Sequence, residues 1–431
     1  MSTARTSRLG LVFCAVAVTA FAARVAAALW LDGFFHPQLE EAAVIARNIV
    51  AGRGFTFSYL GIVYHSYQAP LPALLGAVSY WLTGSPASYM TLQILAGTLL
   101  SVIAAAIAHR LCGHWIAALA AGILVALHPG LVVYNASRFH PLSFDSLVFS
   151  LGLLQSFRLA EKPDTVRGAQ MGAIVGIGLL SRPTMLVFLP VSAVWLVVVT
   201  SAAMRRAAIR SAIVATICAA VIIAPWTIRN YRLHDRFVFI LTTDNELLWR
   251  GNNPHANGSS YLDKDHTVLS TLPADALFDL EHQPNEIAQS QWFRTRALAF
   301  MRSDPAAFAR LLVRKFVIFW SWGSVTGVLY PRQWVQAYLT YYVLAVVLAA
   351  LGVWQILRMH RQSVHLLVLV GAFMLTLSLL QTIYYVEGRH RWGIEAMLLA
   401  VSGVGVAALS RRRLLHDGGH EPARASTLGA H

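Results

Sequence analysis

The sequence predicts an all-α polytopic membrane protein with about ten transmembrane helices. Of its 431 residues, 57% are hydrophobic and only 13% are charged, and the mean hydropathy is +0.57. The net charge of +14 could indicate a nucleic-acid partner. Lysine and arginine, however, form short clusters between apolar runs, which is the pattern that orients helices in a membrane. The composition therefore favours a lipid-embedded bundle with no nucleic-acid partner.

Ten apolar runs account for the predicted helices, since a helix needs about 20 apolar residues to cross a bilayer. The first run is too long for a signal peptide, so we expect an uncleaved first helix. Arg24 lies inside it and should face the bundle interior or reach the membrane surface. The ten runs are residues 9–31, 89–109, 115–132, 143–160, 168–182, 184–203, 208–226, 334–357, 363–384 and 391–410.

The basic clusters between these runs all fall on one side of the membrane if the ten runs are the spans. By the positive-inside rule that side is the cytoplasm, and both termini lie on it. Two further stretches, 69–83 and 311–330, would each move later clusters to the wrong side if either alone crossed the membrane. We therefore expect both to form interfacial or re-entrant helices on the outer face.

The predicted domain organisation follows from these spans. An N-terminal transmembrane module, 1–226, contains a first outer loop at 32–88. An outer-face region, 227–333, is the one segment polar and long enough for a small subdomain, and it includes an amphipathic helix at 285–303. The last transmembrane helices occupy 334–413, and the polar tail 414–431 should be disordered.

The first outer loop holds the most informative pair of residues, Glu40 and Glu41. They open an amphipathic helix between Pro37 and Ala51, where the helix dipole favours ionised carboxylates. An ionised carboxylate can act as a general base on an acceptor hydroxyl. Helix capping explains the same pair equally well from spacing alone.

Further charged side chains are expected at the outer face. Asp145 is a candidate second catalytic carboxylate or a partner of Arg138, with His140 beside them. Arginines on this face depart from the positive-inside rule and suit a phosphate group. Glu395, inside the last span, should pair with Arg389 or Arg391. Such a pair either belongs to a lid over a lipid phosphate or is a structural salt bridge between the last two spans. The arginines concerned are Arg182, Arg229, Arg250, Arg389 and Arg391.

The sequence indicates no metal or disulfide site. The three cysteines have no CxxC or Cys/His spacing. Asp263-Lys264-Asp265 resembles a DxD metal motif, but three residues are a weak match and a solvated loop explains them better. We therefore expect no cofactor; a divalent metal near the acids and histidines is the alternative, which no spacing supports.

Along nearly its whole length the chain resembles the bacterial GT-C glycosyltransferases of the protein-mannosyltransferase-like and aminoarabinose-transferase-like type. The resemblance depends on the order and spacing of several motifs. They are the stretch Glu40 to Phe55, Pro70-Leu71-Pro72, Ser181-Arg182-Pro183, Pro225 to Tyr231, Trp249 to Pro254, and Arg389-His390-Arg391 with Glu395.

The resemblance implies a polyprenyl-phosphate-linked sugar donor and inverting transfer to a lipid, glycan or protein acceptor on the periplasmic face of a bacterial inner membrane. It implies an acidic base in the first outer loop, for which Glu41 is the first choice and Glu40 the second. Many members have aspartate where this chain has Gln38. The alternatives are a lipid or sugar transporter or flippase, and a catalytically inactive assembly subunit of the same fold.

Overall fold

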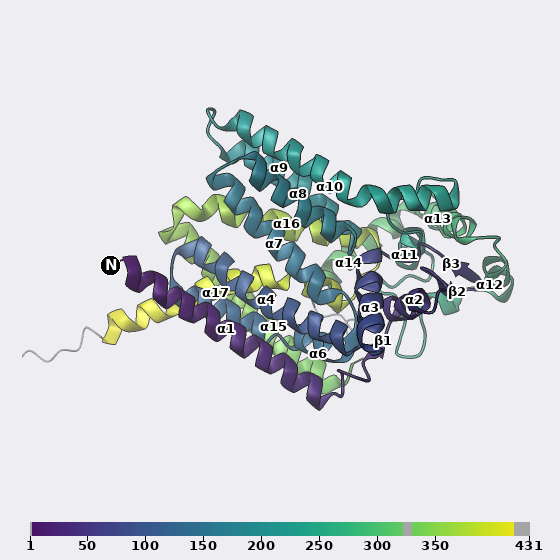
Figure 1. Cartoon of the computed structure of the whole chain (residues 1–431), viewed down its shortest axis with the longest axis horizontal. Helices are drawn as coiled ribbons and strands as arrows, with labels where there is room; N and C mark the ends of the chain where they lie inside the picture. The colour runs from purple at the N-terminus through teal and green to yellow at the C-terminus, as the bar shows by residue number, and fades with distance from the viewer. Residues whose placement is uncertain (1, 322–329, 418–431) are drawn as a thin grey trace, which may run out of the picture.

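The computed structural model describes residues 2–321 and 330–417. Figure 1 shows the start of the first helix and the end of the last helix together at one end of a helical bundle. Short helices and strands gather at the opposite end, which we call the outer end. The common position of the two terminal helix ends agrees with the predicted topology. The tail expected to be disordered, 414–431, lies outside the described residues from residue 418 onward.

All ten predicted runs are helical. Among the described residues, six helices are long and apolar enough to cross a membrane, and a seventh span results if α5 and α6, bent by 47°, are counted as one. The predicted number of ten spans is therefore not confirmed, because α7, α8 and α9 do not meet this test of length and composition. The bundle helices are α1 (Ser2–Trp30), α4 (Ala87–Cys112), α5 (Trp115–Ala126), α6 (Pro129–Ser137), α7 (Leu142–Glu161), α8 (Thr165–Leu179), α9 (Phe188–Val199), α10 (Arg205–His234), α15 (Arg332–Met359), α16 (Val364–Ile383) and α17 (Gly388–Asp417).

Small residues allow these helices to approach closely, as is usual in membranes. A side chain at Gly352 of α15 would bring its Cβ within 2.1 Å of the Val401 carbonyl oxygen on α17. The same holds for Gly405 of α17, whose Cβ would lie 2.0 Å from the Leu348 carbonyl oxygen. Substitution at either glycine would therefore separate the last helix from α15.

The outer end is built from short elements. The expected outer-face stretch 69–83 corresponds to α3, and the stretch 311–330 begins inside α14, which starts earlier, at Pro305. Neither helix is among the candidate spans of the described residues, and residues 322–329 lie outside the described part of the chain. The predicted helix at 285–303 is α13. The elements are α2 (Glu41–Val50), α3 (Pro70–Thr83), α11 (Asp244–Gly251), α12 (Ala274–Glu281), α13 (Glu286–Ser303), α14 (Pro305–Trp320), the hairpin of β2 (Phe57–Tyr59) with β3 (Ile62–Tyr64), and 3₁₀ turns at Pro183–Val187 and Val268–Thr271. A third 3₁₀ turn, Arg361–Ser363, joins α15 to α16.

A parallel strand pair joins two parts of the outer end that lie far apart in the sequence. β1 (Gln38–Leu39) pairs with β4 (Arg138–Phe139), so that Gln38 lies opposite Arg138. Gly33 permits this approach, because a Cβ there would lie 1.5 Å from the Ala136 carbonyl oxygen. The pairing fixes the start of α2 against the end of α6.

Candidate functional site

Glu40 lies at the centre of an ion-paired cluster created by the β1–β4 pairing. It is the N-terminal cap residue of α2 and has an extended backbone. Arg138 donates from Nη1 to Glu40 Oε1 at 2.9 Å, and the ring of His140 lies 3.7 Å from Glu40 Oε2. Arg138 also lies over the rings of Tyr134 and Tyr330, at 5.0 and 5.8 Å from their centroids. The strand register therefore brings together a carboxylate and a guanidinium group that are 98 residues apart in the sequence.

His140 is held neutral in this cluster. Burial, reinforced by the positive charges of Arg389 and Arg182, lowers the pKa of His140 well below its ordinary value. Its Nδ1 accepts a hydrogen bond from the backbone N–H of Leu142 at 3.1 Å. This assigns the ring proton to Nε2, the atom that faces Glu40.

Glu41 is placed differently from its neighbour. It is the first residue of α2, it is partly buried, and its carboxylate makes no hydrogen bond or ion pair with any described residue. The negative charge of Glu41 helps to raise the pKa of Tyr67, after the larger effects of burial and of Glu246. The carboxylate without a partner, next to one that is fully engaged, keeps its lone pairs available for a proton.

Asp145 pairs with Arg182, rather than with Arg138 as one of the two sequence hypotheses had it. It is buried in the first turn of α7. Asp145 Oδ2 accepts from Arg182 Nε at 2.7 Å, and Oδ1 accepts from Ser181 Oγ at 2.6 Å. Both carboxylate oxygens are therefore occupied. The terminal nitrogens of Arg182 make no hydrogen bond with the described residues, so they remain available to a ligand.

Arg389 stands at the edge of an apolar cavity. It pairs with Glu387 at 3.1 Å and lies at the start of α17. The cavity has a volume of about 240 Å³ and is bounded by the end of α1, by α6, by α15 and by α17. A groove of this kind is suited to a hydrocarbon chain, with Arg389 at its polar edge. Its lining includes Trp30, Tyr134, Tyr330, Trp334 and Trp392.

Arg391 and Glu395 belong to the interior of the bundle, which is the structural explanation that the sequence had left open for Glu395. Arg391 is 1% exposed and donates to Glu395, to Tyr338, and to the backbone carbonyls of Phe319 and Ser321. Each of its three nitrogens already has a partner. Arg391 is therefore not available to bind a phosphate, although its sequence neighbour Arg389 lines the cavity.

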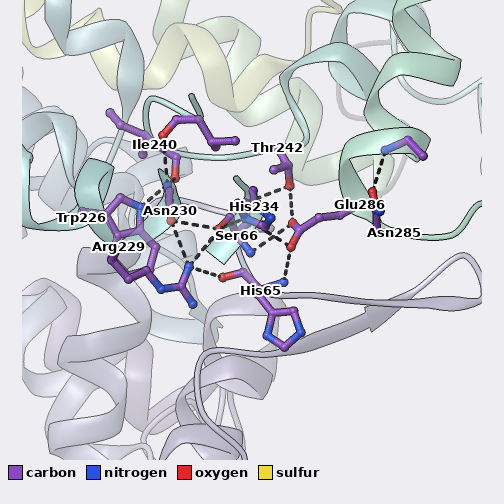
Figure 2. Close-up of polar contacts among 12 residues, drawn as sticks. His65, Ser66, Trp226, Arg229, Asn230, His234, Ile240, Thr242, Asn285 and Glu286 are labelled. Carbon is purple, nitrogen blue, oxygen red and sulfur yellow. Dashed lines mark hydrogen bonds and ion pairs between the residues drawn. The ribbon is translucent and has the colours of Figure 1, made fainter. Parts of the chain in front are cut away.

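Arg229 lies in a different polar network (Figure 2). Its Nη1 donates to the backbone carbonyl of His65 at 2.8 Å, to Ser66 Oγ and to Asn230 Oδ1. Figure 2 also shows Ser66 and Glu286 meeting at His234. This network joins α10, α13 and the segment after β3, and it adjoins a polar cavity of about 520 Å³ lined by His65, His234, Arg236 and Glu286. We therefore separate Arg229 from the cluster around Glu40.

Arg250 occupies an intermediate position. It pairs with Glu246 at 2.6 Å and donates to Tyr59 and Ser260. Burial raises the pKa of Tyr385, and the charges of both Arg250 and Arg389 oppose that rise. Arg250 therefore borders the cluster but is already tied to its own carboxylate.

Several site residues were missed in the sequence analysis. Tyr330 and Tyr134 contact Arg138 through their rings, and Glu387 pairs with Arg389. Glu387 had a signal, because it stands two residues before Arg389 in the same outer turn. The tyrosines had none that distinguished them from membrane-interface aromatics. No group of three or more His, Cys, Asp or Glu side chains among the described residues could hold a metal ion.

Comparison with known proteins finds glycosyltransferases similar to this chain in part of its sequence and in its fold. The family model described as dolichyl-phosphate-mannose-protein mannosyltransferase matches residues 67–228. No curated protein sequence matches the chain. The archaeal oligosaccharyltransferase AglB from Archaeoglobus fulgidus, in complex with an inhibitory peptide and a dolichol-phosphate, has a similar structure with a TM-score of 0.59, 12% identity, and coverage of 97% of this chain and 52% of that one.

Two further structures are similar to the chain. The apo form of the A. fulgidus enzyme has a TM-score of 0.59 and 13% identity, with coverage of 97% of this chain and 53% of that one. ArnT from Cupriavidus metallidurans, bound to undecaprenyl phosphate, has a TM-score of 0.41 and 16% identity, with coverage of 97% and 82%.

The predicted resemblance to GT-C glycosyltransferases is confirmed by the family model and by the fold. The chain spans about half the length of the archaeal enzyme. Its apolar helices and this fold make it a multi-pass membrane protein.

Proposed function

We propose that this protein is a membrane glycosyltransferase that transfers a sugar from a polyprenyl-phosphate-linked donor to an acceptor at the outer end. The observation that carries the proposal is the cluster of three arginines with Glu40 and Asp145 around His140, one arginine of which lines an apolar cavity. Glu41 follows Glu40 directly in the chain. The arginines are Arg138, Arg182 and Arg389. A lipid phosphate needs this combination, because its chain is apolar and its head group is anionic.

The donor would lie with its hydrocarbon chain in the apolar cavity and its phosphate near Arg389 and Arg182. Arg182 is held by Asp145 through Nε, which leaves its two terminal nitrogens for the phosphate. We assign Asp145 the role of orienting Arg182. A guanidinium positioned in advance stabilises the charge that develops on the leaving phosphate.

Glu41 would act as the general base. The acceptor hydroxyl gives its proton to Glu41 as its oxygen bonds to the anomeric carbon. The bond from that carbon to the phosphate oxygen breaks at the same time, and polyprenyl phosphate leaves as the anion. Attack opposite the leaving group inverts the anomeric configuration. Glu40 is less suited to this role, because Arg138 donates to one of its oxygens and His140 faces the other.

The finer parts of the proposal follow the resemblance. We infer a bacterial inner membrane, with the outer end in the periplasm. The family-model description and the dolichol-phosphate bound to the archaeal relative support a polyprenyl-phosphate carrier. The acceptor is a lipid, a glycan or a protein.

A transfer assay with single donors tests the proposal. Membranes containing the protein are incubated with radiolabelled polyprenyl-phosphate sugars, one at a time, and the label is located in the lipid, glycan and protein fractions. We expect transfer by the wild type and a loss of about 10²–10⁴-fold in Glu41→Gln, the range that general-base catalysis contributes.

Glu161→Gln is the matched control, because it neutralises a glutamate that pairs with Arg110 outside the proposed site. Its transfer rate should equal that of the wild type. Full transfer by Glu41→Gln would remove Glu41 from the mechanism. Full transfer by a Glu40→Gln, Glu41→Gln, Asp145→Asn triple variant would remove all three carboxylates from the mechanism. Equal transfer in membranes that lack the protein would refute the enzyme and leave a transporter or an assembly subunit.

A further inference from the structure

The span formed by α5 and α6 is broken inside the bundle, and side chains from three other helices hold the break. α5 ends at Ala126, α6 begins at Pro129, and the two are bent by 47°. Backbone groups without partners are costly in a membrane, so a break needs replacement hydrogen bonds. The residues that supply them come from α1, α15 and α17.

The last carbonyls of α5 lose their normal donors at the break. Pro129 has no N–H to offer the carbonyl four residues earlier, which belongs to Val125. Arg24 of α1 donates to this oxygen from Nη2 at 3.3 Å, and from Nη1 to the Ala126 oxygen at 3.1 Å. The hydroxyl of Tyr341 donates to the Leu124 oxygen at 2.6 Å. Three consecutive carbonyls thus have side-chain donors.

Arg24 is built into this position. Its side chain is 0% exposed, and its positive charge lies at the C-terminal end of α5, where the helix dipole favours a cation. Gly97 of α4 makes the room, because a Cβ there would lie 2.4 Å from both Arg24 Nε and Asn135 Nδ2. An arginine at this depth is expensive and therefore marks a function.

His128 serves the other side of the break. Its Nδ1 accepts from the backbone N–H of Leu131 at 3.0 Å and so caps the first turn of α6. Its Nε2 lies 2.6 Å from Glu395 Oε2 on α17. One ring therefore caps α6 and also attaches its beginning to the last helix.

The direction of α6 determines the geometry of the site. Pro129, Gly130, Val133 and Tyr134 all line the apolar cavity. The helix then leads directly into β4, which carries Arg138 to Glu40. A straight continuation of α5 would displace the cavity wall and Arg138 together.

We propose that Arg24 and His128 are positioning residues for the donor site: by satisfying the two helix ends at the break, they aim α6 and thereby set the cavity wall and the Arg138–Glu40 pair. The proposal rests on the proposed function for the identity of the ligand. Its structural part does not depend on any ligand.

Hydrogen–deuterium exchange on the purified protein in nanodiscs tests the structural part. In Arg24→Leu, we expect amides of residues 129–140 and 36–50 to exchange about tenfold faster, the effect of losing roughly one hydrogen bond's net free energy. Residues 286–303 of the outer end should exchange as in the wild type. Arg110→Leu, which removes an arginine elsewhere in the bundle, should leave both regions unchanged.

Binding of undecaprenyl phosphate to the same nanodiscs tests the functional part. Arg24→Leu should weaken binding about tenfold, and Arg24→Lys, which keeps the charge and donors, should restore part of it. His128→Asn retains an N-cap acceptor but loses the bond to Glu395, so it should bind better than His128→Ala. Tyr341→Phe removes a single donor and provides a milder variant if Arg24→Leu does not fold.

The outcomes are distinguishable. Unchanged exchange in 129–140 in Arg24→Leu, or in Tyr341→Phe if that is the variant available, would overturn the proposal. An equal increase in the exchange rate of amides across the whole chain would also overturn the proposal, since such an increase would show that Arg24 contributes to global stability alone. Faster local exchange in a protein whose wild type binds no undecaprenyl phosphate would support the positioning role and refute the proposed donor.

Discussion

Two clusters in this protein contain the same types of side chain but differ in what they can do. Each joins a glutamate, an arginine, a histidine and a tyrosine. In the cluster at the outer end, the glutamate, arginine and histidine side chains are 12–16% exposed. In the cluster inside the bundle, the corresponding side chains are 0–3% exposed. The outer cluster is Glu40, Arg138, His140 and Tyr134; the inner cluster is Glu395, Arg391, His128 and Tyr338.

The difference lies in how fully each arginine is engaged. Every nitrogen of Arg391 has a partner, and the inner cluster ties α17 to α15 and to the end of α14. Arg138 makes one hydrogen bond to Glu40 and lies near Arg182 and Arg389, whose charges reach His140. Burial and saturation of donors, rather than residue type, therefore separate a structural cluster from one that can receive a ligand.

The largest expected effect is on the inner cluster. Arg391→Met would leave the Glu395 carboxylate buried without its cation, which costs about 3–5 kcal/mol. We expect a large fall in the unfolding temperature in detergent, or failure to accumulate in membranes. A variant as stable as the wild type would show that the inner cluster does not support the fold.

Arg389→Met, two residues away, should have the opposite profile. The fold should survive, because Arg389 is partly exposed and forms an ion pair with Glu387 alone among the described residues. Undecaprenyl phosphate binding should weaken by about 10–100-fold, the equivalent of a lost charge-assisted hydrogen bond. Unchanged binding, measured in nanodiscs beside the wild type, would remove Arg389 from the proposed donor site.

The smallest expected effect is the pH dependence of folding stability that His140 contributes. The pKa of His140 in the folded protein lies below its unfolded value of about 6.5. Below pH 6.5 the unfolded chain binds a proton that the folded chain does not, so the stabilisation from neutral His140 is complete above this pH and decreases as the pH falls. The loss should be at most about 1.4 kcal/mol per pH unit.

His140→Gln should flatten this part of the profile. Denaturation midpoints between pH 5 and 7.5 provide the measurement, and the exposed His282→Gln variant provides the control. A wild-type profile that His140→Gln leaves unchanged would contradict a depressed pKa in the folded state.

Much of the architecture was predictable because it depends on local composition. Ten apolar runs became helices, and the terminal helix ends lie at one end. The acids at the start of α2 were also recognisable, since a helix start can be read from a few consecutive residues. The number of spans could not be predicted in the same way, because α7, α8 and α9 are helical but lack the length or apolarity of a span.

The sequence by itself determined the membrane bundle, the outer position of Glu40 and Glu41, and an excess of arginine on that face. Only the tertiary structure decided which arginines remain available. Arg389 and Arg391 are indistinguishable in the sequence, yet one lines a cavity and the other is saturated inside the bundle. The charge of Arg24 is likewise explained only by the tertiary structure, in which the side chain lies beside the break after α5. Such roles depend on contacts between helices far apart in the chain, which local sequence patterns do not encode.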